Sequence, residues 1–160
     1  MSNLTALLSR TLQTAGPATA ATTAALAACG SWKNGNSVAP INAVSHIVWG
    51  DDAASQDDAS FRHTAPGVAL NAAAIAAWSA VYELAFGPRV RAGDARAALI
   101  GGATTAALAY VTDYYVVPRR LTPGFEKRLS LFTLDVGRVR SLGSEPAAGI
   151  AVGRSTIQGA

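Results

Sequence analysis

Residues 66–86, PGVALNAAAIAAWSAVYELAF, decide the fold class, because they form one apolar run long enough to cross a bilayer. Pro66 stands at the start of the run, where a helix tolerates proline. Gly87 and Pro88 follow its end and stop the helix, and Arg89 then supplies a charged anchor at the membrane edge. The stretch predicts a transmembrane helix over residues 66–86.

Two further apolar runs approach the length of a span. Residues 97–117, AALIGGATTAALAYVTDYYVV, follow the possible N-cap Asp94 and carry tyrosines near their end, as an aromatic belt does. Residues 11–29, TLQTAGPATAATTAALAAC, carry no charge, but threonine, glycine and proline make them less apolar. A basic residue before an apolar stretch of small residues also describes a signal peptide, and LAACG at residues 26–30 resembles the lipobox of a lipoprotein leader with a lipidated Cys29, so both are alternatives to a span here.

The composition supports a membrane protein and excludes several other classes. Apolar residues make up 50% of the chain and charged residues 14%, against about 25% charged in soluble domains. The net charge is +3, yet the basic residues form no stripe and are not interleaved with aromatic residues, so we predict no nucleic-acid partner. A single cysteine excludes an intramolecular disulfide framework. We therefore predict an all-α, Ala/Gly-rich transmembrane bundle of about three spans, with the lipid bilayer as its main partner.

Residues 42–64, between the first two runs, hold both histidines and four of the ten acidic residues. Ile41 and Val44 begin a helical spacing of apolar residues over residues 41–49, which are too few to span. We expect an amphipathic helix at the membrane interface here, with Trp49 at head-group depth. The following residues, 51–60, are expected to be an acidic, solvated loop.

With three spans, one side of the membrane gathers a set of polar candidates for function. They are His46, Trp49, Arg62, His63, Asp113 and Arg120. The weak candidates for a metal site are His46, His63, Asp51 and Asp52, but the histidine spacing matches no zinc motif, so we predict no metal. The chain also lacks the G-x-S-x-G, P-loop and G-x-G-x-x-G patterns, so we predict no catalytic residue and no cofactor.

Glu83 and Asp113 are the only acidic residues inside the predicted spans. Each ends a stripe of small residues at helical spacing, so both are expected to face the bundle interior. One hypothesis is structural: each acid pairs with an arginine or caps a backbone group. The other is a proton or ion site, because carboxylates within a membrane mark such paths.

Four segments carry a family resemblance: NAVSHIVWG at 42–50, RHT at 62–64, YELAFG at 82–87 and DYYVVPRRLTPGFE at 113–126. They resemble small, uncharacterised, multi-pass inner-membrane proteins of proteobacteria, and the similarity covers about residues 15–130. The resemblance implies a helical integral membrane protein of about four spans with no established activity. Beyond Leu131 this chain departs from the pattern, since its last residues are too interrupted to span.

These patterns predict a helical membrane domain over residues 1–130 and an irregular tail over residues 131–160. We expect a bacterial inner-membrane protein that is not an enzyme and that packs with a second copy or a membrane partner. One alternative is a small transporter or proton-linked permease subunit that uses Glu83, Asp113 and His46. A second alternative is a membrane-bound, metal-dependent hydrolase with His46 and His63 as ligands. The basic residues are too evenly divided between the two sides to predict an orientation.

Overall fold

The structure, a computed structural model, describes residues 3–125 together with Arg128 and Leu129. These residues belong to one compact unit, residues 1–130, and they form helices and turns without a strand. The all-helical fold class is therefore confirmed. The tail expected over residues 131–160 lies outside the described residues.

The first helix, α1 (Asn3–Asn34), is longer at both ends than the apolar run over residues 11–29 that predicted it. Hydropathy marked only the uncharged part of this helix, whereas Arg10 and Lys33 lie within it. The helix ends at Asn34 and is followed by Gly35, whose φ of 66° lies in the left-handed region that favours glycine. The connection between α1 and the next helix therefore begins at Gly35.

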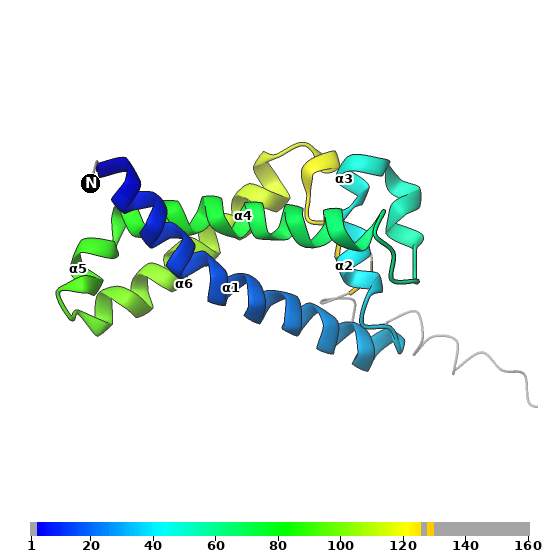
Figure 1. Ribbon diagram of the computed structural model, residues 1–160, viewed down its shortest axis with the longest axis horizontal. Helices are drawn as coiled ribbons and strands as arrows, with labels where there is room; N and C mark the ends of the chain where they lie inside the picture. Colours follow the sequence, from blue (N-terminus) through cyan, green and yellow to red (C-terminus); the bar gives the residue numbers. More distant parts are fainter. Residues whose placement is uncertain (1–2, 126–127, 130–160) are drawn as a thin grey trace, which may run out of the picture. The chain divides into compact units, whose positions relative to one another are not determined.

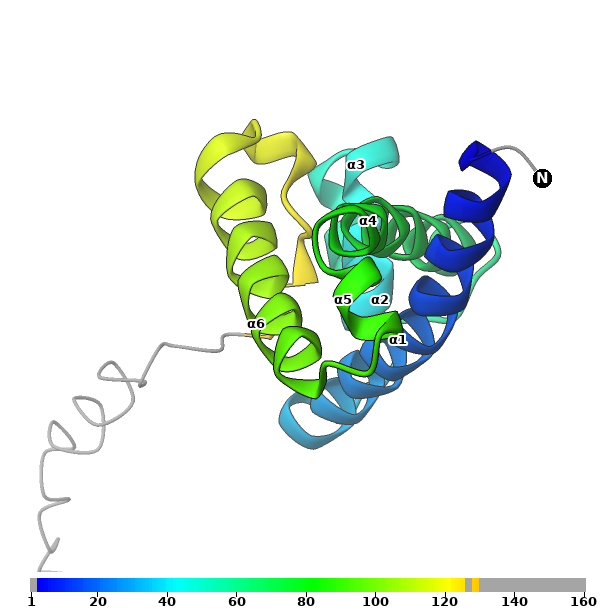
Figure 2. The same cartoon turned by 90° about the vertical axis from the view of Figure 1, so that its left-hand side faces the viewer.

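The helices α4 (Thr64–Ala85) and α6 (Ala95–Val111) match the other two predicted runs closely. The helix α4 lies between α1 and α6 and contacts both of them (Figures 1 and 2). It runs antiparallel to α1, since Thr14 contacts Glu83 while Thr23 contacts Asn71. At the start of α6, the Asp94 side chain accepts a hydrogen bond from Ala97 N at 2.9 Å, which confirms the predicted N-cap.

The expectation of one continuous helix over residues 41–49 is wrong. The chain forms two short helices, α2 (Ala39–Val44) and α3 (His46–Trp49), which are separated at Ser45. Every residue of α2 is buried, and the helix packs against α1 and α4. Gly67 of α4 makes this packing possible, because a Cβ atom there would overlap the Ile41 carbonyl group. Ile41 and Val44 thus mark contacts within the protein, whereas Val48 and Trp49 at the end of the stretch are about half exposed.

Three short elements complete the end of the unit that contains α2 and α3. The 3-10 helix η1 (Asp51–Ser55) replaces the start of the expected solvated loop, and its Ala53 and Ala54 are buried. The π-helical turn η2 (Thr112–Val116) continues α6, and the 3-10 turn η3 (Arg119–Leu121) follows it. At the opposite end, α5 (Gly87–Arg91) links α4 to α6.

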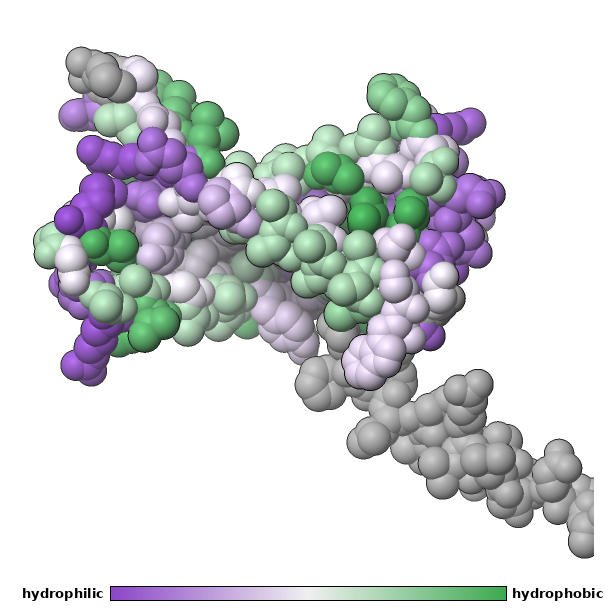
Figure 3. Space-filling view, turned by 60° about the horizontal axis from the view of Figure 1, so that its bottom comes forward, coloured by the Kyte–Doolittle hydropathy of each residue, from purple (hydrophilic) through white to green (hydrophobic). Residues whose placement is uncertain are grey.

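The unit buries small and polar side chains and exposes large apolar ones. Most of its buried apolar residues are alanines, and the buried polar residues include Thr11, Asn42 and Ser79. By contrast, Leu84 is 65% exposed and Leu99 is 77% exposed. The hydrophilic residues gather toward the two ends of the face drawn in Figure 3, with paler and apolar residues between them.

Among the described residues, one helix is long and apolar enough to cross a membrane, and that helix is α4. Only 6% of its most apolar window is buried inside the unit. The helix α6 has 17 residues, which is slightly short, and α1 carries charges and threonines along its length. The bundle of three spans thus stays an expectation.

Candidate functional site

The Asn42 side chain organises the polar end of the unit, and it is fully buried. Its Nδ2 donates hydrogen bonds to the carbonyl oxygens of Gln56 at 3.1 Å and Asp58 at 2.9 Å. Its Oδ1 accepts a hydrogen bond from the Thr64 hydroxyl group at 2.8 Å. One amide therefore ties α2 to the chain that precedes α4 and to the first residue of α4.

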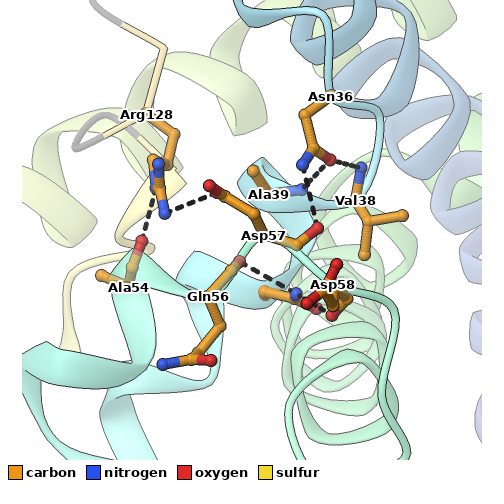
Figure 4. Close-up of polar contacts among 9 residues, drawn as sticks. Asn36, Val38, Ala39, Ala54, Gln56, Asp57, Asp58 and Arg128 are labelled. Atoms are coloured by element: carbon orange, nitrogen blue, oxygen red, sulfur yellow. Dashed lines mark hydrogen bonds and ion pairs between the residues drawn. The ribbon is translucent and has the colours of Figure 1, made fainter.

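Two further polar side chains, Asn36 and Arg128, hold the segment between α3 and α4 in place (Figure 4). Asn36 caps the turn before α2, because its Oδ1 accepts from the backbone N–H groups of Val38 and Ala39, and its Nδ2 donates to Asp57 O at 2.9 Å. Arg128 forms an ion pair with Asp57 at 2.9 Å and donates from Nε to Ala54 O. The expectation of an acidic, solvated loop over residues 51–60 holds for the aspartates, which are exposed, whereas Ala53 and Ala54 are buried and backbone groups of the segment anchor the end of the bundle.

A cavity of about 670 Å³ lies beside His46, between α3, the start of η1 and the segment that follows α6. It collects four of the polar residues singled out from the sequence. These are His46, Trp49, Asp51 and Arg120. Tyr114, Arg119 and Thr122 add to the wall, and sequence reasoning did not select them as site residues.

His46 is the most deeply buried polar group of this cavity, at 1% exposed. Its Nδ1 lies 2.8 Å from Ala43 O, and a carbonyl oxygen only accepts, so Nδ1 carries the hydrogen. Gly124 covers the same edge of the ring, because a Cβ atom there would lie 2.5 Å from Nδ1 and 2.6 Å from Cε1. Nε2 is buried and has no hydrogen-bond partner in the described part of the chain.

The other histidine belongs to a neighbouring group that shares Trp49 with the His46 cavity. His63 Nδ1 lies 3.1 Å from the Ser60 hydroxyl oxygen, at the turn that precedes α4. Trp49 donates from its indole to Arg62 O at 2.8 Å, and the Arg62 guanidinium lies 5.1 Å from the Trp49 ring centroid, in a cation–π contact. Arg62 and His63 therefore hold this turn together and are absent from the wall of the His46 cavity.

Glu83 lies at the opposite end of α4 and has a partner on each oxygen. Arg91 forms an ion pair with Oε2 at 2.7 Å, and the Thr14 hydroxyl donates to Oε1 at 2.7 Å. The predicted pairing with an arginine is thus confirmed. The geometry favours the structural hypothesis for this residue over a proton site.

Asp113 belongs to η2, where the wider helical turn changes the direction of the side chains that follow. It lines an open groove of about 730 Å³, to which α1, α4 and α6 all contribute. Trp78 lines the same groove, and Asp113 forms no ion pair with an arginine within the described residues. The small residues Gly102 and Ala106 line the same groove, so their stripe faces an open space rather than a closed interior.

No three His, Cys, Asp or Glu side chains converge on a possible metal position in the described part of the chain. His46 and His63 have different partners, and Asp51 and Asp52 are exposed. The described residues therefore do not assemble the ligands that the metal-hydrolase alternative requires.

The chain matches no protein-family model, no curated protein and no solved structure. The resemblance to proteobacterial inner-membrane proteins thus stays a prediction. The class that the residues themselves define is an all-helical unit with an exposed apolar surface and a polar cavity at one end.

Proposed function

We propose that this protein is a multi-pass integral protein of the bacterial inner membrane in which α1, α4 and α6 are the spans. The exposed apolar surface is the observation that carries the proposal. The apolar window of α4 is almost unburied, and large apolar side chains of all three helices are exposed. In water such a surface is costly, at about 25 cal/mol per Å² of apolar area, whereas lipid solvates it.

The distribution of charge supports the same proposal. Basic residues lie toward the ends of the long helices, as Arg10 and Lys33 do in α1, and in the segments between and after these helices, where a membrane meets water. The acids near the long helices are Glu83, Asp94 and Asp113, and the first two have hydrogen-bond partners. A span can hold such groups when they are paired.

We further propose a non-enzymatic role, in which the protein packs with a second copy of itself. A shallow apolar groove runs along α1 and α4 and is lined largely by small residues, including Gly16, Ala20 and Ala24 at a spacing of four. This spacing lets two helices approach closely within a bilayer. A Cβ atom at Gly16 would meet nothing within 4 Å, so the surface has room for another helix.

Fractionation of the expressed protein tests the membrane proposal. We expect the protein to remain in the membrane after a carbonate wash and to be released by detergent. Recovery as a soluble, monodisperse protein would overturn the proposal, and the apolar surface would then need another cover.

Labelling of single cysteines tests the number of spans. In a Cys29→Ser background, cysteine at Ser9 and Arg89 is expected to react with an impermeant maleimide from one side of the membrane. Cysteine at Lys33, Arg62 and Arg120 is expected to react from the other side. Labelling of Ser9→Cys and Lys33→Cys from the same side would exclude α1 as a span, and the pair Arg62→Cys and Arg89→Cys gives the same test for α4.

A further inference from the structure

We propose that the His46 cavity binds the phosphate group of an anionic phospholipid whose head group also carries a hydroxyl group, as a glycerol head group does. The inference rests on the proposed membrane location and goes beyond it, because it assigns a ligand to a site. Three features of the cavity lead to this ligand: its charge, an unpartnered nitrogen atom and its apolar neighbour.

The charged groups of the cavity favour an anion. Arg119 and Arg120 both line it, against the single acid Asp51. Neither guanidinium group forms an ion pair with an acid in the part of the chain that the structure describes. The turn η3 fixes their backbone, because the Thr122 hydroxyl donates to Arg119 O at 2.8 Å. Guanidinium groups bind phosphate oxygens in a planar, often bidentate geometry, so two adjacent arginines suit a phosphate group.

The His46 ring favours a ligand that carries a hydrogen-bond donor beside its phosphate group. Because Nδ1 carries the hydrogen, Nε2 of the neutral ring offers a lone pair. This atom is buried without a partner, on a residue that lines the cavity. A buried acceptor without a partner is unfavourable, and a ligand hydroxyl group would remove this cost. A phosphodiester with a hydroxylated head group supplies both the anion and the donor.

The surroundings of the cavity suit the rest of a lipid molecule. Tyr114 lines the cavity and also the apolar groove between the long helices, so the two spaces share a wall. Val48 and Trp49 form part of the cavity wall and are about half exposed. A phosphate in the cavity therefore leaves its acyl chains beside apolar surface, and basic sites at the ends of membrane helices bind lipid head groups in this way.

Trp49 provides the signal for a direct test. The Trp32→Phe/Trp78→Phe variant keeps Trp49 as its single tryptophan, since the chain has three. In detergent, this protein is titrated separately with dihexanoyl phosphatidylglycerol, dihexanoyl phosphatidylcholine, glycerol 3-phosphate and inorganic phosphate while Trp49 fluorescence is recorded. We expect phosphatidylglycerol to bind at least about tenfold more tightly than each of the other three, because it alone combines the anion, the hydroxyl group and the chains.

Variants separate specific binding from general charge attraction. Arg119→Gln/Arg120→Gln is expected to weaken phosphatidylglycerol binding about tenfold or more, since both guanidinium groups are lost. The matched control Arg89→Gln/Arg96→Gln removes two exposed arginines near the other end of the bundle and is expected to leave binding unchanged. An equal loss of phosphatidylglycerol binding in both double variants would overturn the assignment of the lipid site to the His46 cavity.

The four titrations also distinguish the possible sources of the phosphate. Binding of inorganic phosphate or glycerol 3-phosphate as tight as that of the lipid would overturn the lipid assignment. If phosphatidylcholine, which is zwitterionic, binds as tightly as phosphatidylglycerol, the assignment of an anionic lipid is overturned. A failure of the membrane proposal is seen separately, because the carbonate wash then releases the wild-type protein.

Discussion

The Arg91 guanidinium lies 2.7 Å from the Glu83 carboxylate, across the junction between α4 and α5. The two side chains differ in exposure, since Glu83 is 9% exposed and Arg91 is 40% exposed. Loss of the arginine therefore leaves a nearly buried charge whose remaining partner is Thr14, whereas loss of the carboxylate leaves a cation that water can reach.

This asymmetry predicts that Arg91→Ala destabilises the protein more than Glu83→Gln does. We expect about 2 kcal/mol for Arg91→Ala and about 1 kcal/mol for Glu83→Gln, because the glutamine can still accept from Thr14. The double variant is expected to cost less than the sum of the two. Thermal unfolding in detergent measures all three variants, and additive effects would show that the pair is not coupled.

Among single substitutions at the polar end of the unit, we expect those of the buried Asn42 to destabilise the protein most. Asn42→Ala removes three hydrogen bonds at once and leaves their partners unsatisfied, so we expect a loss of about 2–4 kcal/mol. Asn42→Asp is expected to cost more, because it places an acceptor against two carbonyl oxygens. The change is measured as the shift in the thermal unfolding midpoint.

Asn71→Ala is the matched control for Asn42, because it removes the same amide from a half-buried position. The Asn71 side chain forms one hydrogen bond within the described residues, to Thr23 at 3.4 Å, so its loss is expected to cost below about 1 kcal/mol. Similar losses from Asn42 and Asn71 would contradict the organising role of Asn42.

Local sequence patterns predicted the helices well. Apolar runs, N-cap residues and the glycines or prolines that stop a helix are all signals that lie within a few residues of one another. Residues 66–86 and 97–117 are close to α4 and α6, and Asp94 caps α6 as expected. The helix ends were less predictable. Apolar length alone missed the extension of α1 to Asn34, since charged residues fit the exposed ends of a helix.

The candidate site was predictable only in part, because it depends on contacts distant in sequence. His46, Trp49, Asp51 and Arg120 share a cavity, as their predicted side of the membrane suggested. The role of Asn42 was missed, since its partners are carbonyl groups of an irregular segment that no periodicity marks. The pair Arg119 and Arg120 after a proline was a usable signal, although only Arg120 was selected from it.

Substitution by alanine is expected to change the stability of the protein in opposite directions at two adjacent glycines of α6. A Cβ atom at Gly101 would lie 2.6 Å from Cγ of the Phe86 ring, whereas one at Gly102 would meet nothing within 4 Å. Gly101→Ala is therefore expected to destabilise the protein by about 1–3 kcal/mol through overpacking. Gly102→Ala is expected to be neutral or to stabilise it by up to about 1 kcal/mol, because alanine favours a helix. Thermal unfolding of both variants tests the contact between α6 and Phe86, and equal effects would contradict it.

The small-residue groove of α1 and α4 predicts where a second copy of the protein packs. Ala20 is exposed and lines this groove, whereas Ala25 is exposed elsewhere on α1. Ala20→Leu is expected to abolish self-association in detergent, because its side chain fills the space that the partner helix needs. Ala25→Leu adds the same volume away from the groove and is expected to leave the oligomer intact. Size-exclusion chromatography with light scattering measures the mass of each variant, and an unchanged oligomer in Ala20→Leu would exclude this face as the contact.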